Sequence, residues 1–523
     1  MISNQKENGI ANESTMPYPK NHYRAPRCSA VFNIFLYKSI YLWYNLSVKY
    51  FEIRLTEKGP YPYMKKERLL GLPLHMLPTI FALAWPTMLE QLLQTAVQYV
   101  DTAMVGSLGT SATAAVGSTT TVNWLIGSTI SAVAVGFLAF ISQSLGRDDV
   151  ESTKKATSQA ALAVLVCGVL FTAITLGLSG VVPTLMQVDP AIRPLASKYF
   201  FILYLPMLPR AASIIFGTVL RAAGDTKTPM VVGIVVNIVN VTLNFLLIYP
   251  TRVIGKITVI GAGLGVVGAA IASAIAFAVG GVLITIAVWK HPKVSFKGYS
   301  LRPDKTILSP CMKVAFPNAL QRFGTSLGYV VFAAMVNSLG EISTAAHMIA
   351  NTVESAFYIP GYGMQSAAAT LAGNAFGARD RKRIKELSSM IIVIEVLLMI
   401  ISGALLFAFA PNMVRLFSSD EQVISLGSAV LRMVALSEPF YGVSIIIEGM
   451  MQGMGKTVMP FVTNIIGMWL IRIAGTFVCT QLLSLGLVSA WGCMILHNMM
   501  LFFVFAIYFK FFRMKKLALE LGE

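Results

Sequence analysis

Charged residues are scarce in this chain. Asp, Glu, Lys and Arg make up 12% of its 523 residues, whereas hydrophobic residues make up 55%. An ordinary soluble protein carries about twice that share of charged residues, which it needs to cover its surface. The composition therefore excludes an ordinary soluble domain and indicates a protein that lies in a lipid bilayer.

Cysteine and histidine are also rare, at five residues each. The cysteines show no spacing typical of a metal site, and most lie in or beside apolar stretches, where a small apolar side chain explains them. The histidines are scattered, and no paired-aspartate or Ser-Lys constellation accompanies them. We therefore expect no metal site, no cofactor and no enzymatic activity.

Long apolar stretches are what the chain has in abundance. A helix needs about 20 apolar residues to cross the hydrocarbon core of a bilayer. Stretches of this kind occur at 77–105, 112–141, 156–183, 198–220, 228–250, 261–289, 308–338, 344–372, 388–411, 428–451, 458–483 and 488–512. The sequence therefore predicts an all-α integral membrane protein with twelve transmembrane helices.

The last six stretches repeat the first six at one constant offset along the chain. Ala103–Gly109 reads AMVGSLG, and Ala334–Gly340 reads AMVNSLG. Punctuating residues keep the same offset, as in Pro86 and Pro317, Gly146 and Gly377, and Asp149 and Asp380. Six spans is an even number, so both repeats have one orientation and form two parallel six-helix lobes. Such duplication is typical of transporters that work by alternating access.

These patterns divide the chain into five segments. We predict an N-terminal extension with a cytoplasmic lead-in (1–76), an N-terminal lobe (77–289), a basic cytoplasmic linker (290–307), a C-terminal lobe (308–512) and a cytoplasmic tail (513–523). Residues 1 to about 63 do not belong to the repeat, and Met64 is followed by Lys-Lys-Glu-Arg. We expect Met64 to be the true start, or the extension to be dispensable for transport.

The net charge of +17 raises the question of a nucleic-acid partner. The Lys and Arg residues, however, lie in alternate loops, with five in 290–305 and five in 379–385. Others flank the first and the last span. By the positive-inside rule, this pattern predicts that both termini and the linker are cytoplasmic. Phosphate binding by these loops is the more specific alternative, but the membrane topology already explains the positive charge. We expect no nucleic-acid partner.

One acid inside a span stands out as a site for a coupling ion. Ionisable groups in a bilayer are costly, so each is a functional hypothesis. Asp101 has Phe332 as its repeat equivalent, whereas a purely structural capping residue should recur. Asn240 and Asn244 share a helix face one turn apart. With Ser273, these side chains predict an oxygen-rich cluster suited to a hard cation or a proton network. Local capping by Asp101 and helix–helix contacts by the Asn pair are the structural alternatives.

A second group of polar residues predicts a wet cavity for cargo. Glu90, Gln94 and Gln98 form a polar stripe down one side of the first span. Arg322 occupies a nearly equivalent place in the seventh span and needs an acid, for which Glu90 and Glu354 are the candidates. Packing of the stripe against another helix is the alternative.

In combination, these motifs resemble one family, the multidrug and toxic compound extrusion (MATE) transporters. The resemblance covers about residues 77–512. It rests on Pro86, VDTAMVGSLG at Val100–Gly109, Gln143 with Gly146, RAAGDTKTP at Arg221–Pro229, Ala345-Ala346-His347, and Gly373 with GARD at Gly377–Asp380.

The resemblance implies a secondary transporter with two six-helix lobes around a central cavity, which exports organic molecules in exchange for inward H⁺ or Na⁺. It also implies a cation site in the N-terminal lobe, at residues that match Asp101, Asn240, Asn244 and Ser273. Some members carry Asp where this chain has Asn244. The sodium-coupled branch has a Glu and an Asp in its C-terminal lobe, and the aligned positions here are Thr325 and Tyr441. Glu438 lies one turn before Tyr441, and Glu354 lies on the eighth helix, which leaves a displaced site in that lobe open. We expect coupling through Asp101, with H⁺ ahead of Na⁺.

The expected function is thus an antiporter in the plasma (inner) membrane that works as a monomer on small, amphiphilic organic cations. The alternative is a flippase of related fold that moves lipid-linked or polysaccharide cargo. A strongly cationic cavity would favour the flippase, and Arg210 and Arg322 keep this alternative open.

Overall fold

The computed structural model describes residues 68–69, 72–186, 188–254 and 257–513. The expectation that Met64 is the true start, and nearly all of the expected tail, lie outside the described residues. The part of the chain that begins at Met64 forms one compact unit.

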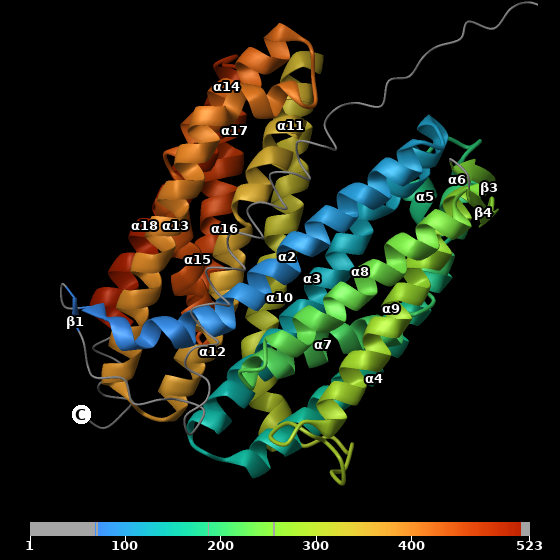
Figure 1. Ribbon diagram of the computed structural model, residues 1–523. Helices are drawn as coiled ribbons and strands as arrows, with labels where there is room; N and C mark the ends of the chain where they lie inside the picture. Colours follow the sequence, from blue (N-terminus) through green and yellow to red (C-terminus); the bar gives the residue numbers. More distant parts are fainter. Residues whose placement is uncertain (1–67, 70–71, 187, 255–256, 514–523) are drawn as a thin grey trace, which may run out of the picture. The chain divides into compact units, whose positions relative to one another are not determined.

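Helices account for nearly all of the described structure (Figure 1). The first half contains a one-turn 3-10 helix η1 (Leu74–Met76) and the helices α2 (Leu77–Gly106), α3 (Thr110–Gly146), α4 (Val150–Gly177), α5 (Val182–Leu185), α6 (Arg193–Tyr204), α7 (Met207–Ala222), α8 (Lys227–Leu247) and α9 (Gly265–Lys290).

The second half contains α10 (Lys305–Asn337), α11 (Glu341–Phe357), α12 (Ile359–Gly377), α13 (Arg381–Arg415), α14 (Glu421–Ala435), α15 (Glu438–Gly453), α16 (Val458–Ile466), α17 (Ala474–Phe477) and α18 (Leu487–Ile507). Three π-helical turns continue these helices at η2 (Gly467–Ile473), η3 (Val478–Leu482) and η4 (Tyr508–Arg513). Each of the twelve apolar stretches therefore coincides with one helix or with consecutive helices.

Seven helices in the described ranges are long and apolar enough to cross a membrane, or nine if each of two bent pairs counts as one span. The bent pairs are α6–α7, at 51°, and α14–α15, at 55°. A proline accompanies each bend, Pro206 before α7 and Pro439 in the first turn of α15. Proline has no N–H to donate to the preceding turn, which favours a break at these positions, although Pro86 and Pro317 lie inside the continuous helices α2 and α10. The two bends lie at repeat-equivalent positions.

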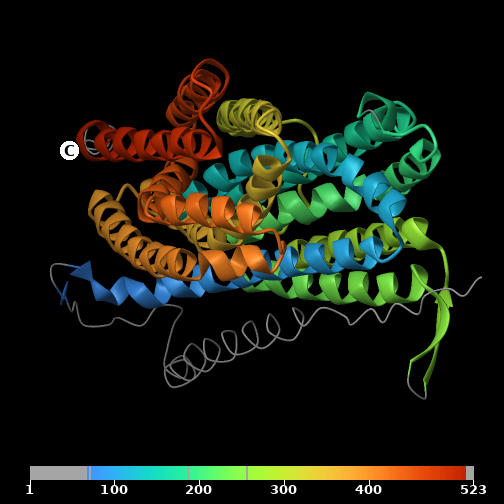
Figure 2. The ribbon, with the colours of Figure 1, turned by 90° about the horizontal axis from the view of Figure 1, so that it is seen from above.

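Two short hairpins complete the part of the chain that the structure describes. Strand β1 (Arg68–Leu69) pairs with β2 (Leu72–Pro73), and β3 (Pro250–Ile254) pairs with β4 (Ile257–Ala262), both antiparallel. Figure 2 shows the β3–β4 hairpin extending away from the ends of α8 and α9. This hairpin was not predicted from the sequence. Because β4 extends to Ala262, the sixth helix begins at Gly265 and not at 261 as expected.

The first helix of each half begins in the core of the other half. Ile80 and Ala84 of α2 belong to an apolar cluster built from α12, α13 and α15. Ile307 and Cys311 of α10 belong to a cluster built mainly from α3, α4 and α7. Figure 1 shows the start of α2, in blue, beside α12 and its later turns beside α8. The two halves are therefore joined by an exchange of helix starts as well as by the linker.

The ends of α3 and α12 make a reciprocal contact. A Cβ atom on Gly146 would collide with the backbone carbonyl of Asn374, and one on Gly377 would collide with that of Gln143. Gln143 and Asn374 are themselves repeat equivalents. Only glycine permits this approach of two backbones. Gln143 also reaches across the halves, because its side-chain nitrogen donates to the carbonyl of Gly453 at 3.0 Å.

The helices that follow this contact start in the same way. The Asp149 carboxylate accepts from the backbone N–H of Ser152 at 2.9 Å and caps α4. Its equivalent, Asp380, accepts from the N–H of Arg383 at 2.8 Å and caps α13. Capping satisfies N–H groups that a helix start leaves without partners. The Asp residues that marked the repeat in the sequence are therefore helix starts.

Candidate functional site

Three helices bring the four predicted coupling residues together. The Asn244 side-chain nitrogen, on α8, donates to the Asp101 carboxylate of α2 at 2.6 Å and to the side-chain oxygen of Asn240 at 3.1 Å. The Asn240 nitrogen donates to the Ser273 hydroxyl of α9 at 3.2 Å. These contacts form one connected network of a carboxylate, two amides and a hydroxyl.

The local sequence explains this arrangement. Asn240 and Asn244 are four residues apart, so they lie on one face of α8, and both are buried. In an apolar environment, a buried amide without partners is costly, which favours the helix rotation that turns both toward Asp101. Asp101 and Ser273 are half-buried at the edges of the network.

The Asn240 amide fits the network in two orientations. With its oxygen and nitrogen exchanged, the nitrogen donates to both Asp101 oxygens, at 2.8 and 3.2 Å, and the oxygen accepts from Ser273 at 3.2 Å. In this orientation the carboxylate accepts from both Asn residues, but the side-chain nitrogens of Asn240 and Asn244 face each other at 3.1 Å, so the hydrogen bond between the two amides is lost. The side-chain oxygen of Asn244 is buried and has no hydrogen-bond partner among the residues that the structure describes. The network therefore has spare accepting capacity next to Asp101.

The donor set does not resemble a transition-metal site. Within the described ranges, no group of three or more His, Cys, Asp or Glu side chains could hold a metal ion. The cluster supplies one carboxylate, amide oxygens and a hydroxyl, which are the ligands of hard cations and of proton networks.

The predicted cargo residues do not form one site. Gln94 and Gln98 are exposed on α2, whereas Glu90 is half-buried on the same helix. Glu354 is buried at the end of α11, where it accepts from the Tyr358 hydroxyl at 2.7 Å. Glu354 therefore belongs to the interior of the second half, and its prediction as a residue of the shared cavity is not supported by this geometry.

The predicted acid partners of Arg322 were wrong. The Arg322 Nε donates to the side-chain oxygen of Asn318 at 3.1 Å, and the acid within electrostatic range of its guanidinium is Glu448. Glu90 instead pairs with Arg221 of α7, with an N–O distance of 3.0 Å. Which acid an arginine meets depends on how helices are rotated about their axes, and the sequence pattern does not determine that rotation.

A repeat-related polar cluster, missed in the sequence, occupies the second half. The equivalents of Glu90 and Arg221 are Gln321 and Gln452. Both donate to Glu448 of α15, at 2.8 and 3.1 Å. The constant offset between the repeats would have linked these positions, had it been applied to Glu90 and Arg221.

The position equivalent to Asp101 has a different environment. Phe332 is buried, and its ring lies 5.6 Å from the ring of His347 and 4.4 Å from the guanidinium carbon of Arg472. The second half therefore has no counterpart of the Asp101 network at this position.

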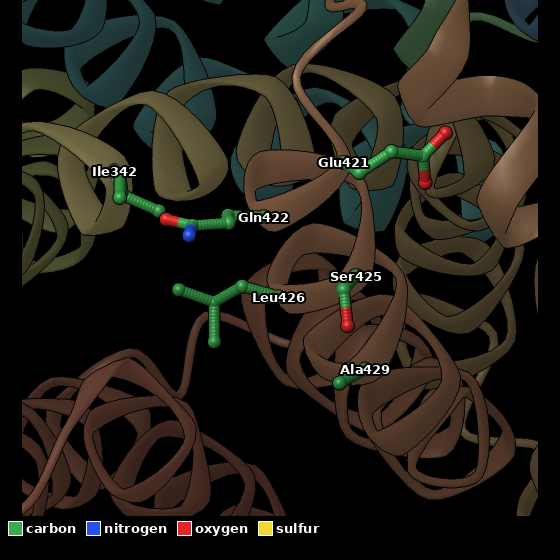
Figure 3. Close-up of a pocket in the computed structure, with 6 residues that line it drawn as sticks. All are labelled: Ile342, Glu421, Gln422, Ser425, Leu426 and Ala429. Carbon is green, nitrogen blue, oxygen red and sulfur yellow. The ribbon is translucent and has the colours of Figure 1, made fainter.

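A surface pocket of about 490 Å³ lies elsewhere, between α11 and α14, and is lined by Ile342, Glu421, Gln422, Ser425, Leu426 and Ala429. Figure 3 shows Gln422 and Leu426 facing Ile342 across it. None of the predicted site residues lines this pocket, so it adds nothing to the candidate site.

Comparison with known proteins agrees with this architecture. A family model described as MatE matches residues 86–246 and 317–478, one range in each half. The chain is 26% identical over 416 residues to the "Probable multidrug resistance protein NorM" of Thermotoga maritima, which covers 80% of this chain and 88% of that protein. It is 24% identical over 429 residues to the human "Multidrug and toxin extrusion protein 1", covering 80% of this chain and 72% of that one.

A solved structure of a MATE protein in the bent conformation superposes with a TM-score of 0.79 at 21% identity, covering 86% of this chain and 97% of that chain. The two chains therefore share a fold, and the two matched ranges start at repeat-equivalent prolines, Pro86 and Pro317.

Proposed function

Since this chain belongs to the multidrug and toxic compound extrusion family, and is thus a membrane transporter and not an enzyme, we propose that it is an antiporter that exports organic molecules in exchange for an inward flow of H⁺ or Na⁺. The observation that carries this proposal is the hydrogen-bond network of Asp101, Asn240, Asn244 and Ser273.

The network suits a group that gains and loses a proton. An ionised carboxylate only accepts hydrogen bonds, whereas a protonated carboxyl also donates one. A side-chain amide can serve either state, because a flip of the amide exchanges its donor for its acceptor. Asn244 donates to Asp101 at 2.6 Å and has an oxygen without a partner among the described residues, which the flipped amide would offer to a protonated Asp101.

H⁺ is the coupling ion that we favour, and Na⁺ is the alternative. The same oxygens of Asp101, Asn240 and Ser273 are hard ligands of the kind that alkali and alkaline-earth cations prefer. A single carboxylate would, however, leave a sodium ion dependent on neutral ligands for most of its coordination.

The reciprocal contact of α3 and α12 supports an alternating-access mechanism. It lies beside the basic loops that follow Gly146 and Gly377, the end that we propose to be cytoplasmic. Two halves that touch at one end are free to separate at the other. We therefore propose that this conformation is closed to the cytoplasm, and that ion binding at Asp101 repacks α2 against α8 and α9 during the change to the opposite state.

The cargo that we propose is a set of small, amphiphilic organic cations, carried by one chain in the plasma membrane. The names of the relatives, which refer to multidrug resistance and extrusion, support a broad specificity. The exposed Gln94 and Gln98 of α2 are the polar lining that we propose for the cargo path. One chain contains both halves, which supports a functional monomer.

The test is efflux of a fluorescent organic cation from proteoliposomes, with pH and Na⁺ gradients imposed separately, for wild type, Asp101→Asn and the exposed-acid control Asp189→Asn. We expect efflux driven by the pH gradient in wild type and in Asp189→Asn, and at least a tenfold loss in Asp101→Asn.

Undiminished efflux in Asp101→Asn contradicts coupling through this network. Efflux that is driven only by the Na⁺ gradient would identify Na⁺, and not H⁺, as the coupling ion. No efflux under either gradient contradicts the antiporter and favours the flippase, which the same vesicles would test with a fluorescent lipid-linked oligosaccharide.

A further inference from the structure

Two carboxyl groups in the second half have no hydrogen-bond partner. Glu395 of α13 and Glu438, the first residue of α15, are each 0% exposed. Neither oxygen of either side chain is bonded to any residue that the structure describes. Buried polar groups are almost always hydrogen-bonded, so four unbonded carboxyl oxygens in one region require an explanation.

A third acid on the same lobe shows the usual solution. Glu448, further along α15, accepts from Gln321 at 2.8 Å, from Gln452 at 3.1 Å and from Asn464 at 3.4 Å. An ionised carboxylate needs such donors, because its burial without them costs several kcal/mol or more. Glu395 and Glu438 lack them, and protonation removes most of that cost.

Glycines leave room for both side chains. A Cβ on Gly361 of α12 would lie 2.8 Å from the Oε1 of Glu395, and one on Gly442 of α15 would lie 3.0 Å from it. A Cβ on Gly403 of α13 would lie 3.5 Å from the Cβ of Glu438. The helices are therefore packed around these two acids.

The surrounding charges make the region acidic. Glu438 lies within electrostatic range of Glu395 and of Glu354. The charged or titratable groups that interact electrostatically with these acids include Tyr358, Tyr362 and Arg472, and Tyr441 interacts with Tyr358. Arg472 acts on Glu354, whereas the groups that act on Glu438 are Glu354 and Glu395, which carry the same sign of charge. Protonation neutralises a carboxyl group in such a place.

The arrangement of Glu395 and Glu438 suits the binding of protons and not of a metal ion. A cation such as Na⁺ or Ca²⁺ needs several oxygen ligands that converge on one point. Among the described residues, no three acidic, histidine or cysteine side chains are arranged to hold a metal ion. The Oε1 of Glu395 instead lies against the two glycines.

We propose that Glu395 and Glu438, next to Glu354, form a second proton-binding site in the C-terminal half, separate from the Asp101 network. Each step is the addition of a proton from water to a carboxylate oxygen, or its return to water. The proposal that these protons are transported rests on the proposed antiport function, whereas the proton binding itself does not.

Both carboxyl groups are 0% exposed, so exchange of protons with water requires a movement of the helices around them. Glu438 is the first residue after the 55° bend between α14 and α15. A change in this bend moves the start of α15 relative to α13, and thereby opens or closes the space around both carboxyl groups. Bent helix pairs are the elements that most readily change shape in a packed bundle.

The binding test is infrared difference spectroscopy of the full-length protein in lipid nanodiscs, which detects the carbonyl stretch of protonated carboxyl groups during a pH step. The variants are Glu395→Gln, Glu438→Gln, the double variant, Asp101→Asn and, as control, Glu341→Gln, an exposed acid of the same lobe. Gln keeps the size of the side chain, and thermal unfolding of each variant checks that it is folded.

We expect each single Gln variant in the C-terminal half to lose part of the carbonyl band, and the double variant to lose the sum of both parts. Glu341→Gln should keep the whole band, and Asp101→Asn should lose a different part. A double variant that keeps the whole wild-type band overturns the proposal.

The coupling test is the number of protons exchanged per cargo molecule, measured from the pH gradient that just balances a cargo gradient. We expect a smaller ratio in Glu395→Gln/Glu438→Gln than in wild type, and a dependence of the efflux rate on pH that shifts in this variant. An unchanged ratio and pH profile overturn the transport of these protons. Asp101→Asn could transport like wild type while Glu395→Gln and Glu438→Gln still reduce the carbonyl band. That result would contradict the proposed role of Asp101 and would support the proton-binding site of Glu395 and Glu438.

Discussion

Glu90 of α2 and Arg221 of α7 form an ion pair at 3.0 Å, with side chains that are 14% and 18% exposed. Arg221 also donates to the Thr218 hydroxyl at 3.4 Å. In the second half, the equivalent positions are both glutamine and share one acid, Glu448. The two halves thus fill equivalent positions with different chemistry, a charge pair in one and two neutral amides that donate to a third residue in the other. That third residue, Glu448, also lies within electrostatic range of Arg322.

The first prediction concerns this ion pair. Glu90→Gln should destabilise the protein by about 3 kcal/mol, because it leaves the Arg221 charge without an acid in a partly buried place. Glu90→Gln/Arg221→Gln should cost less than Glu90→Gln alone, because it removes both charges and recreates the glutamine pair of the second half. Unfolding in detergent, analysed as a double-mutant cycle, measures the difference. Additive effects would contradict an energetic link between the two residues.

The second prediction concerns the contact between the halves. Gly146→Ala should weaken it by about 1–3 kcal/mol, because the new methyl group meets the backbone carbonyl of Asn374. The conformation open on this side should therefore become more populated, and efflux should slow. Gly117→Ala is the matched control, since Gly117 lies on the same helix with nothing within 4 Å of an added Cβ.

The readout is the distance between spin labels at Lys155→Cys and Lys382→Cys, two exposed positions just beyond the contact. A longer distance should gain population in Gly146→Ala and not in Gly117→Ala. An identical distance distribution in wild type and Gly146→Ala would exclude the contact as a determinant of the closed state.

The third prediction concerns the amide beside Asp101. Asn244→Ala removes the donor at 2.6 Å from the carboxylate. A hydrogen bond to a charged group contributes about 1.5–3 kcal/mol, so proton-driven efflux should fall by about tenfold or more. Asn237→Ala, on the same helix, changes an amide whose nitrogen has no hydrogen-bond partner in the described part of the chain and should behave like wild type. Equal losses in both variants would show that α8 responds to any loss of an amide.

The fourth prediction concerns pH and the start of α4. Hydrogen bonds from Ser152 hold the pKa of Asp149 below its usual value. A carboxylate with a lowered pKa stabilises the fold at every pH above its unfolded-state pKa, about 4, and loses this effect as the pH falls through the lower, folded-state pKa. Asp149→Ala should therefore cost about 1 kcal/mol at neutral pH and progressively less below pH 4.

The unfolding midpoint of wild type and Asp149→Ala, followed from pH 7 to pH 3, measures this effect. Asp149→Asn is the control, because Asn caps helices about as well as Asp but does not titrate. A difference between wild type and Asp149→Ala that stays constant down to pH 3 would show that the carboxylate charge plays no part.

Much of the architecture could be predicted from the sequence, because residues that cap or interrupt helices act locally and can be recognised by type. Asp149 and Asp380 mark helix starts, and the apolar stretches mark the helices. The Asp101 network was also predictable, because the spacing of Asn240 and Asn244 fixes their common face on α8.

Partner choice was not predictable. The sequence identifies Arg322, Glu354 and Glu395 as ionisable groups within apolar stretches, but which of them finds a partner depends on the rotation and bending of helices far apart in the chain. Arg322 meets Asn318 on its own helix, whereas Glu395 meets no donor in the described structure. The angles of the two bends, 51° in α6–α7 and 55° in α14–α15, were not predictable either, because a proline alone does not give the angle.

The contact at Gly146 and Gly377 has the character of an isologous interface, although both of its surfaces belong to one chain. Each glycine meets the carbonyl of the residue three positions before the other glycine, so the two contacts are copies related by the pseudo-twofold axis. Any displacement of one half along the other breaks both copies together, and closure must restore both together. The reciprocal contact of α3 and α12 therefore forms in a single register. In any other register, neither copy of the contact stabilises the closed state.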